Sequence, residues 1–500
     1  MQCARWIAGL VVVVAACGFP RPKQADAIEA APDAAGDTDP CALALSEITP
    51  QVIYEGQGTG GSAPALLVIR GNHIVNANLA VELKADDGTT AVQLTPVEGA
   101  RASSDHAYLA FTVTAPVDDK LGNIAATDVP LDVTVRQDAP LDGSCAGPAT
   151  QTLSGQLVLR VLPELTNPQV TTAALYSRIE LGNLDQSGLG FAEPLALNAV
   201  SSITLGSVSV SSSGARSGPG GYSAGATPGP GAGGDGGNAS GLLFGTGGGG
   251  GGAGFASAGQ VGGAGGATAG TAGIITGEDQ ILSVDENRAS AGGKGGAGVT
   301  VLGGPLAPGG AGGGGGGFLL LTAGGDITTG DVFAGGGNGA DSGGAGGGGG
   351  AGAGGTVVAR SGNGKLALGM VRVPAGSPGA PGGGSASVGR VRWDSPSGEA
   401  PSSPDHAAHR GPSFLDPVHV VTARGQAFTL IGSPGDDIDI RVSDGRDMSN
   451  DARGTSFSSA GKATITPQLF PGYNQLCAKL AGGAPNEPVA NTCLEVAFLP

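Results

Sequence analysis

One pattern in the chain is typical of nucleophilic catalysis, the G-x-S-x-G sequence Gly221-Tyr222-Ser223-Ala224-Gly225. In hydrolases this motif needs a buried strand before the serine and a helix after it. Here Ser-Gly-Pro-Gly precedes it and Ala-Thr-Pro-Gly-Pro-Gly follows it. A P-loop is also missing, because Ala463 follows Gly461-Lys462 where the motif requires Ser or Thr. We therefore expect no catalytic residue, no cofactor and no enzyme activity.

Two further clusters have side chains that bind metal ions in other proteins. His406 and His409 are close in sequence but lie in a Ser/Pro-rich stretch with no third ligand nearby, so we expect exposed histidines. The acidic stretch 436–439, with Asp444 and Asp447, lacks the residue order of a calcium loop. We expect a solvated turn there and no metal site.

The N-terminus reads as a secretion signal over residues 1–16. Arg5 supplies the positive charge, and the apolar run Ile7–Ala16 is shorter than the roughly 20 residues that cross a bilayer. The run ends Val14-Ala15-Ala16-Cys17, which resembles the lipoprotein box of bacterial lipoproteins. The resemblance implies lipid attachment at Cys17 and, with Gly18 after it, an outer-membrane lipoprotein facing the periplasm or the surface. The alternative is a plain signal peptide in which Cys17 is incidental.

Composition limits the partners. The net charge is −17 and no Lys/Arg cluster occurs, so a nucleic-acid partner is not expected. Residues 17–40 are rich in Pro, Ala and Asp, which favours a disordered tether between the lipid and the first folded domain. The membrane partner is reached through the N-terminal lipid, and envelope or extracellular proteins or glycans remain open.

The cysteines point to an oxidising compartment. Beyond the signal and Cys17, four remain, and they allow three pairings. We predict the disulfides Cys41–Cys145 and Cys477–Cys493, because each pair brackets one region that is not glycine-rich. The chain has no C-x-x-C sequence and no Cys/His pair at zinc spacing.

Short alternating apolar runs separated by Gly, Asn, Asp and Pro indicate β-strands at both ends of the chain. Over 41–165 the sequence from Ile48 to Asn72 resembles the opening of IPT/TIG-type immunoglobulin-like (Ig-like) domains, which implies a spacer or protein-contact module. Over 413–500 the stretch from Leu469 to Cys477 resembles the penultimate-strand entry of bacterial Ig-like domains.

The region 166–395 contains most of the 98 glycines, yet it has a repeat. Apolar pairs of short strands recur, and the steps from Ile327 to Leu366 and from Phe318 to Val357 are both 39 residues. Ile274-Ile275 with Ile281–Val284 reads as another unit, and Val391-Arg392-Trp393 as the last. Repeated units that cannot fold alone are typical of solenoids, and the glycine returns are suited to pack as extended helices between which only glycine fits. The alternative is a disordered linker.

The region resembles the Gly-rich repeats of actinobacterial PGRS-type proteins and Gly-rich lipoproteins of myxobacteria. We therefore predict an all-β protein with two Ig-like β-sandwich domains that flank a Gly-rich β-solenoid-like region, with a linker over 396–412. The predicted function is a non-catalytic, lipid-anchored envelope protein with a structural, spacer or adhesive role. The alternative is a glycan-binding surface lipoprotein, for which Trp393 is the one tryptophan outside the signal.

Overall fold

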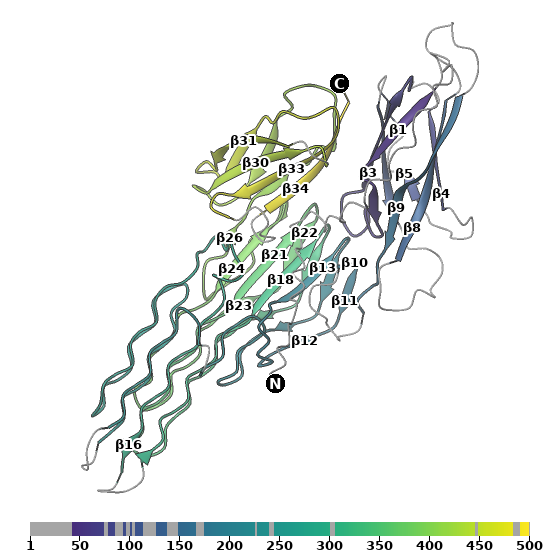
Figure 1. Cartoon of the computed structure of the whole chain (residues 1–500). Helices are drawn as coiled ribbons and strands as arrows, with labels where there is room; N and C mark the ends of the chain where they lie inside the picture. Colours follow the sequence, from purple (N-terminus) through teal and green to yellow (C-terminus); the bar gives the residue numbers. More distant parts are fainter. Residues whose placement is uncertain are drawn as a thin grey trace, which may run out of the picture.

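The computed structural model shows an all-β protein (Figure 1). It describes residues 43–74, 79–85, 94–96, 101–102, 106–113, 127–137, 149–166, 175–225, 228–239, 245–300, 306–445, 449–483 and 491–499. The predicted signal, the tether, Cys17, Cys41 and Cys145 lie outside these residues. Among the residues described, no helix is long and apolar enough to cross a bilayer.

The N-terminal unit is a sandwich of two sheets. Its first sheet has the order β1-β3-β7-β5, with β6 also on β7, and its second has the order β2-β9-β8-β4. The strands of the first sheet are β1 (Ala44–Thr49), β3 (Ala65–Asn72), β7 (His106–Val113), β5 (Leu94–Pro96) and β6 (Arg101–Ala102). Those of the second are β2 (Val52–Tyr54), β9 (Ala149–Val161), β8 (Thr127–Gln137) and β4 (Ala80–Ala85). Alternate residues such as Leu67, Ile69, Val133 and Leu159 fill the space between the sheets, as half-buried strands require.

The middle of the chain forms successive turns, and these turns contribute their strands in order to three parallel sheets. The first sheet contains β10 (Leu175–Tyr176), β13 (Leu195–Ala199), β18 (Phe318–Ala323), β21 (Thr356–Ser361), β24 (Arg390–Asp394) and β26 (His409–Arg410). The second contains β11 (Ile179–Leu181), β14 (Ile203–Leu205), β19 (Ile327–Thr329), β22 (Lys365–Leu368) and β25 (Ser397–Gly398). The third contains β12 (Leu184–Asp185), β15 (Val208–Ser209), β20 (Val332–Phe333) and β23 (Val371–Arg372). We call these stacked turns the coils.

Like side chains stack inside the coils. Ile203 pairs with Ile327 and Ile327 with Leu366, so the predicted step of 39 between the last two is confirmed. The predicted pairing of Phe318 with Val357 is wrong by one residue, since Phe318 lies opposite Thr356. Four residues separate Ser361 from Leu366, whereas three separate their partners Ala323 and Ile327, and this extra residue after β21 shifts the register of the first sheet relative to the second.

This shift decides which side chains form the core. Leu319 and Leu321 point into the coils and are fully buried there. Phe318 and Leu320 point the other way and contact Ile281 and Val358 on the outer face. Of the four residues whose 39-residue steps predicted the repeat, Ile327, Val357 and Leu366 belong to the main apolar column inside the coils, and only Phe318 belongs to the outer cluster.

Two other assignments change. Ile274 and Ile275 form no coil and are exposed, and the stretch from Ile281 to Val284 is a loop against the outer face of the first sheet. The predicted linker 396–412 instead contains β25, which pairs with β22, and β26, which pairs with β24. The coils thus continue to Arg410.

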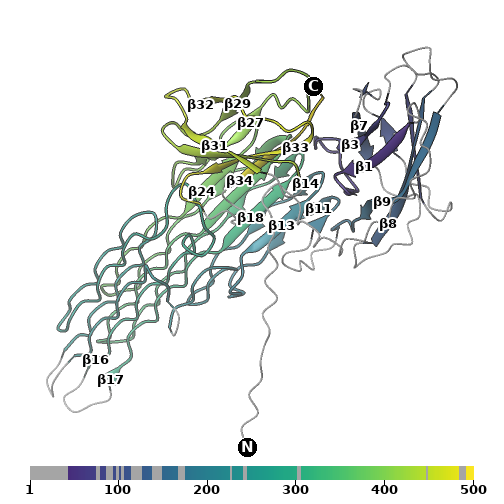
Figure 2. The ribbon, with the colours of Figure 1, turned by 45° about the horizontal axis from the view of Figure 1, so that its top comes forward.

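The glycine-rich stretches leave the coils at one corner, between the third and first sheets. They comprise the described residues of 210–317, together with 334–355 and 373–389, and with the hairpin of β16 (Gly298–Val299) and β17 (Leu306–Ala307) they build a bundle that projects from the coils. We call this bundle the arm. Figure 2 shows its extended segments side by side, ending at β16 and β17.

Backbone hydrogen bonds with a period of three hold the arm together. The N–H groups of Gly247, Gly250 and Ala253 donate to the carbonyls of Ala345, Gly348 and Ala351. The N–H groups of residues 248, 251 and 254 donate to the segment 231–237, and the N–H groups of residues 249 and 252 donate to the segment 260–263. A period of three residues per turn is that of the polyproline II helix, so the packing of extended helices that the glycine returns suggested is confirmed.

Residues 247–254 are enclosed on all sides. Hydrogen bonds connect them to six neighbouring segments, which are 231–237, 260–263, 270–273, 293–296, 345–351 and 384–387. A Cβ added at Gly250 would lie 2.1 Å from the carbonyl oxygen of Gly293. The long glycine runs are therefore the inner segments, where backbones touch and no side chain fits.

The C-terminal unit is a second sandwich. Its sheets have the orders β27-β29-β32 and β28-β34-β33-β30-β31. The first contains β27 (Ser413–Leu415), β29 (Phe428–Ile431) and β32 (Lys462–Ile465), and the second contains β28 (Val420–Val421), β34 (Asn491–Phe498), β33 (Gly472–Leu480), β30 (Asp437–Ser443) and β31 (Ser449–Ser456). Cys477 and Cys493 lie opposite each other on β33 and β34 and form a disulfide, the pairing predicted for this region.

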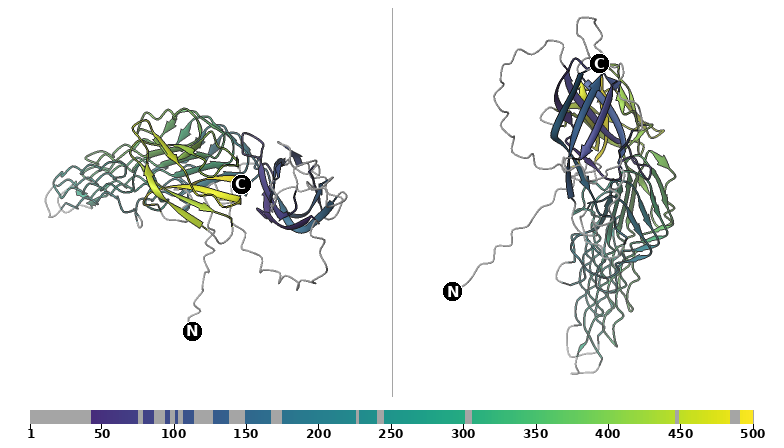
Figure 3. Two further views of the ribbon diagram at one scale, coloured as in Figure 1. Left: turned by 90° about the horizontal axis from the view of Figure 1, so that it is seen from above. Right: turned by 90° about the vertical axis from the view of Figure 1, so that its right-hand side faces the viewer.

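The two sandwiches cover the ends of the coils and also touch each other. Leu165, which follows β9 of the first sandwich, donates its amide to Arg178 and accepts from the Glu180 amide in the first coil, and Ser433 of the second sandwich donates its amide to Arg410 in the last coil. Leu66 and Tyr108 of the first pack against Tyr473 of the second. Open ends of parallel coils would expose unpaired backbone, so these contacts act as caps (Figure 3).

Candidate contact site at the tip of the arm

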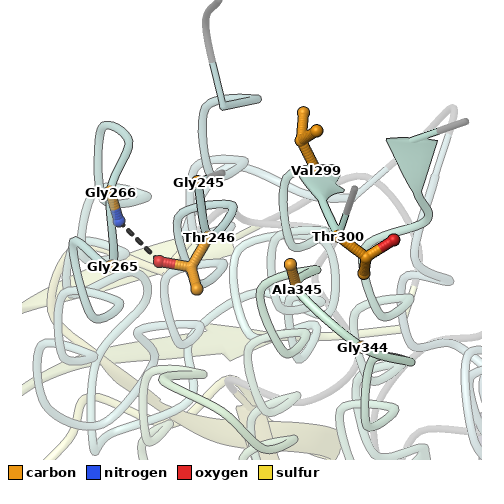
Figure 4. A pocket seen from close by; sticks show the side chains of 8 residues that line it. All are labelled: Gly245, Thr246, Gly265, Gly266, Val299, Thr300, Gly344 and Ala345. Carbon is orange, nitrogen blue, oxygen red and sulfur yellow. Dashed lines mark hydrogen bonds between the residues drawn. The ribbon is translucent and has the colours of Figure 1, made fainter. Parts of the chain in front are cut away.

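The returns between arm segments meet at the end farthest from the coils. There they border a shallow, open depression that is lined by Gly245, Thr246, Gly265, Gly266, Val299, Thr300, Gly344 and Ala345 (Figure 4). The Thr246 hydroxyl accepts a hydrogen bond of 2.7 Å from the Gly266 amide, and Val299 bonds to Gly245. These contacts fix three returns relative to one another.

The lining of this depression has no ionisable side chain. It offers backbone amides and carbonyls, two threonines and the methyl groups of Val299 and Ala345. Leu306, on the adjacent β17, is 52% exposed. Such a surface suits an uncharged partner that makes shape and hydrogen-bond contacts, and it supplies no acid, base or nucleophile.

Outer arm segments are held by Asp and Asn side chains in addition to backbone contact. Asn338 and Asp341 accept hydrogen bonds from the amides of Ser377 and Ala380, at 2.8 and 2.7 Å. Asp326 and Asp331 accept from Lys365 and Met370 in the coils. Each of these four bonds spans 39 residues, so the repeat visible in the apolar strands recurs in polar residues that the sequence reasoning passed over.

Ser223 is not placed as a nucleophile. Its hydroxyl lies 3.1 Å from both the amide and the hydroxyl of Ser217, within the arm's base. The segment has neither the preceding core strand nor the following helix that the motif requires. Among the described residues, no group of three or more His, Cys, Asp or Glu is placed to hold a metal ion.

The two histidines are partly buried and lie within hydrogen-bonding distance of carboxylates, contrary to the expectation of exposed side chains. His409 Nε2 lies 2.7 Å from Asp436, and His406 Nε2 lies 3.3 Å from Asp279. Asp436 also accepts from Gln280 at 2.8 Å and is nearly buried, so it does not belong to a solvated turn. Burial alone would raise the pKa of Asp436, but the hydrogen bonds from His409 and Gln280 outweigh it and lower the pKa. This cluster fastens the last coil to the C-terminal sandwich.

A buried charge network on the first sheet was missed by sequence reasoning. Asp394 accepts from Arg360 at 2.8 Å and from Arg392 at 2.9 and 2.8 Å, and all three side chains are at most 2% exposed. Burial alone would raise the pKa of Asp394, but the two guanidiniums lower it further than burial raises it. The signal was the alternation of charged residues in Arg390–Asp394, which puts Arg390, Arg392 and Asp394 on one face of a strand.

The arginines also fix the loop that joins the arm to the C-terminal sandwich. Arg392 donates to the carbonyls of Gln280 and Ile281, and Arg390 donates to those of Thr276 and Phe255. These hydrogen bonds connect the first sheet to the backbone of Phe255 and of the loop 276–281, so the network has a structural role.

Trp393 is 5% exposed, and the Arg410 guanidinium lies 4.4 Å from its ring centroid. It therefore cannot serve as a platform for a sugar ring. Tyr54, Tyr108, Tyr176 and Tyr473 are buried as well. The fifth tyrosine, Tyr222, is half-buried, and the Arg288 guanidinium lies 4.4 Å from its ring centroid.

Comparison of the chain with protein-family models, with curated proteins and with solved structures gives no match.

Proposed function

We propose that the chain is a non-catalytic, lipid-anchored cell-envelope protein with a structural, spacer or adhesive role, in which the arm carries the contact site. The observation that carries this proposal is the arm itself, a bundle whose inner segments have backbone hydrogen bonds on every side and whose tip is uncharged. Such a construction holds its tip rigidly while supplying no reactive side chain.

The position of the N-terminal sandwich supports an outward orientation. This sandwich and the arm tip lie at opposite ends of the molecule (Figure 1). Lipid attachment at Cys17, followed by a tether over 18–40, would hold the sandwich end near the outer membrane. The tip would then point away from the anchor, toward envelope or extracellular partners.

The finer description of the fold belongs to the same proposal. We infer that both sandwiches are Ig-like and that the coils are a β-solenoid interrupted by the arm. Two facing sheets with buried alternate residues support the first inference, and three parallel sheets with stacked Ile203, Ile327 and Leu366 support the second. Gly-rich lipoproteins of myxobacterial type remain the family that the chain resembles.

Two experiments test the proposal. The first is fractionation of cells that produce the wild type or Cys17→Ser, with mass spectrometry of the mature N-terminus. Release of the variant from membranes and an acylated Cys17 are expected, and an unmodified N-terminus beyond Cys17 would refute the anchor.

The second measures attachment of producing cells to each other and to surfaces. We compare Leu306→Asp at the tip with Val418→Asp, an exposed apolar residue of the C-terminal sandwich. Reduced attachment for the tip variant alone supports the adhesive role. Equal attachment by wild type, tip variant and a strain without the protein contradicts it.

A further inference from the structure

One flank of the arm presents an unusual surface for an acidic protein. It is built from residues 258–264 and 268–276, which run antiparallel, and we call it the flank. Val261, Ile274 and Ile275 on it are 65%, 65% and 58% exposed. Between them lie exposed or half-buried small residues, which are Ala258, Ala264, Thr268, Ala269, Thr271 and Ala272.

The flank is mounted on the inner segment of the arm. Gly259 and Gly262 donate to the carbonyls of Gly273 and Gly270, which ties its two segments together. Gly263 and Gly270 bond to Gly249 of the enclosed segment. Gly262, Gly270 and Gly273 are therefore buried, whereas the residues on either side of each of them are exposed or half-buried. Side chains fixed in this way lose little freedom on binding.

Charge indicates what covers the flank. The chain has a net charge of −17, but residues 236–277 contain no Asp, Glu, Lys or Arg. Two copies of the chain repel each other over most orientations, and this repulsion is smallest where both present an uncharged face. Among the other exposed apolar residues, Met370 lies beside Arg372 and Phe191 lies near Glu193, whereas Leu306 lies at the uncharged tip. An uncharged partner within an acidic protein is most simply the same surface of a second copy.

The geometry is also self-complementary. A twofold axis that lies in the plane of the flank, parallel to its two segments, brings two copies face to face, and because the segments are antiparallel it sets each segment opposite an antiparallel one of the partner. The ridges of Val261, Ile274 and Ile275 then face the low rows of alanine in the partner. We propose that the flank is a homophilic contact, through which two copies of the chain associate by their arms. This proposal concerns the side of the arm and stands whether or not the chain is lipid-anchored or the tip is adhesive.

The contact is expected to be weak. A standard interface buries roughly 800 Å² per partner, and the flank presents only three large apolar side chains, so we expect a dissociation constant above about 1 μM in solution. Confinement of copies to one surface would raise their effective concentration and favour the contact.

Sedimentation velocity of the full chain with Cys17→Ser, so that no lipid contributes, measures the association from about 10 μM to 1 mM. We expect a monomer–dimer equilibrium that salt strengthens, because salt screens the net charge. Val261→Asp should weaken it at least tenfold, and Val418→Asp, outside the flank, should leave it unchanged. Val261 is exposed, so its replacement leaves the packing of the arm intact.

A charge-reversal pair makes the test specific. Val261→Asp and Val261→Lys should each associate poorly alone, and a mixture of the two should recover association, because the flank meets its own copy. A wild type that stays monomeric at 1 mM overturns the proposal. Association that neither variant alters overturns it too, as does binding of the flank to zwitterionic phospholipid vesicles in place of a second copy.

Discussion

Substitution of Gly250 by alanine tests whether the arm is held by backbone contact. The new Cβ would lie 2.1 Å from the Gly293 carbonyl oxygen, whereas ordinary contact begins near 3.4 Å, so the segments must separate by about 1.3 Å. Gly250 donates to Gly348 at 2.9 Å and accepts from Gly384 at 2.8 Å, and such a shift breaks both bonds. Each of these two broken bonds costs about 1–3 kcal/mol when its groups stay buried.

The loss is reduced by the stiffer unfolded chain of the alanine variant, which favours folding by about 0.4–1 kcal/mol. We therefore expect the arm to lose about 2–5 kcal/mol of stability. The matched control is Gly343→Ala, because a Cβ there meets nothing within 4 Å. That variant keeps only the favourable term and should be neutral or slightly more stable.

Hydrogen exchange followed by mass spectrometry suits this test, since exchange reports the opening of individual segments. Peptides that cover 247–254 and 345–351 should exchange faster in Gly250→Ala and unchanged in Gly343→Ala. Unaltered protection in Gly250→Ala, or equal loss in both variants, would show that the inner segments are not packed backbone against backbone.

Three further outcomes are expected. Leu321→Ala, inside the coils, should lower the free energy of unfolding by about 2–5 kcal/mol in urea titrations, and Leu320→Ala on the outer face should lower it by less. The reverse order would contradict the register. Asp394→Asn leaves two buried guanidiniums without their anion and should cost about 3–5 kcal/mol, and a cost near zero would contradict the network. Burial raises the pKa of Glu55 in the folded protein, so ionisation of this carboxyl destabilises the fold as the pH rises through that pKa. Glu55→Gln should therefore be more stable than wild type at pH 7 and lose this advantage at acidic pH. Equal pH profiles of stability for the two proteins would refute the reasoning.

Much of the all-β architecture follows from sequence patterns. Alternating runs identified the strands of both sandwiches, and the step from Ile327 to Leu366 identified neighbouring coils. The pairing of Cys477 with Cys493 followed from the region that they bracket. These features are local, or repeat along the chain, so a single sequence contains them.

What the sequence did not predict depends on contacts between distant segments. The extra residue in the corner after β21 moved Phe318 out of register, and nothing in the strand itself signals the length of a corner. His409 was expected in solvent because its partner Asp436 belongs to another unit of the fold. The tip and the flank arise from returns that the sequence separates widely, and glycine runs alone do not order them.

The enclosed segments of the arm have a thermodynamic consequence. The heat capacity of unfolding rises with the apolar area that becomes exposed and falls with the polar area. Residues 247–254 bury peptide groups with hardly any hydrocarbon, whereas the coils bury leucine, isoleucine and valine. The arm should therefore unfold with a small heat-capacity change per residue, and its stability should vary little on cooling. The body should show the curved temperature dependence of ordinary domains, so the arm and the body should respond differently to a fall in temperature.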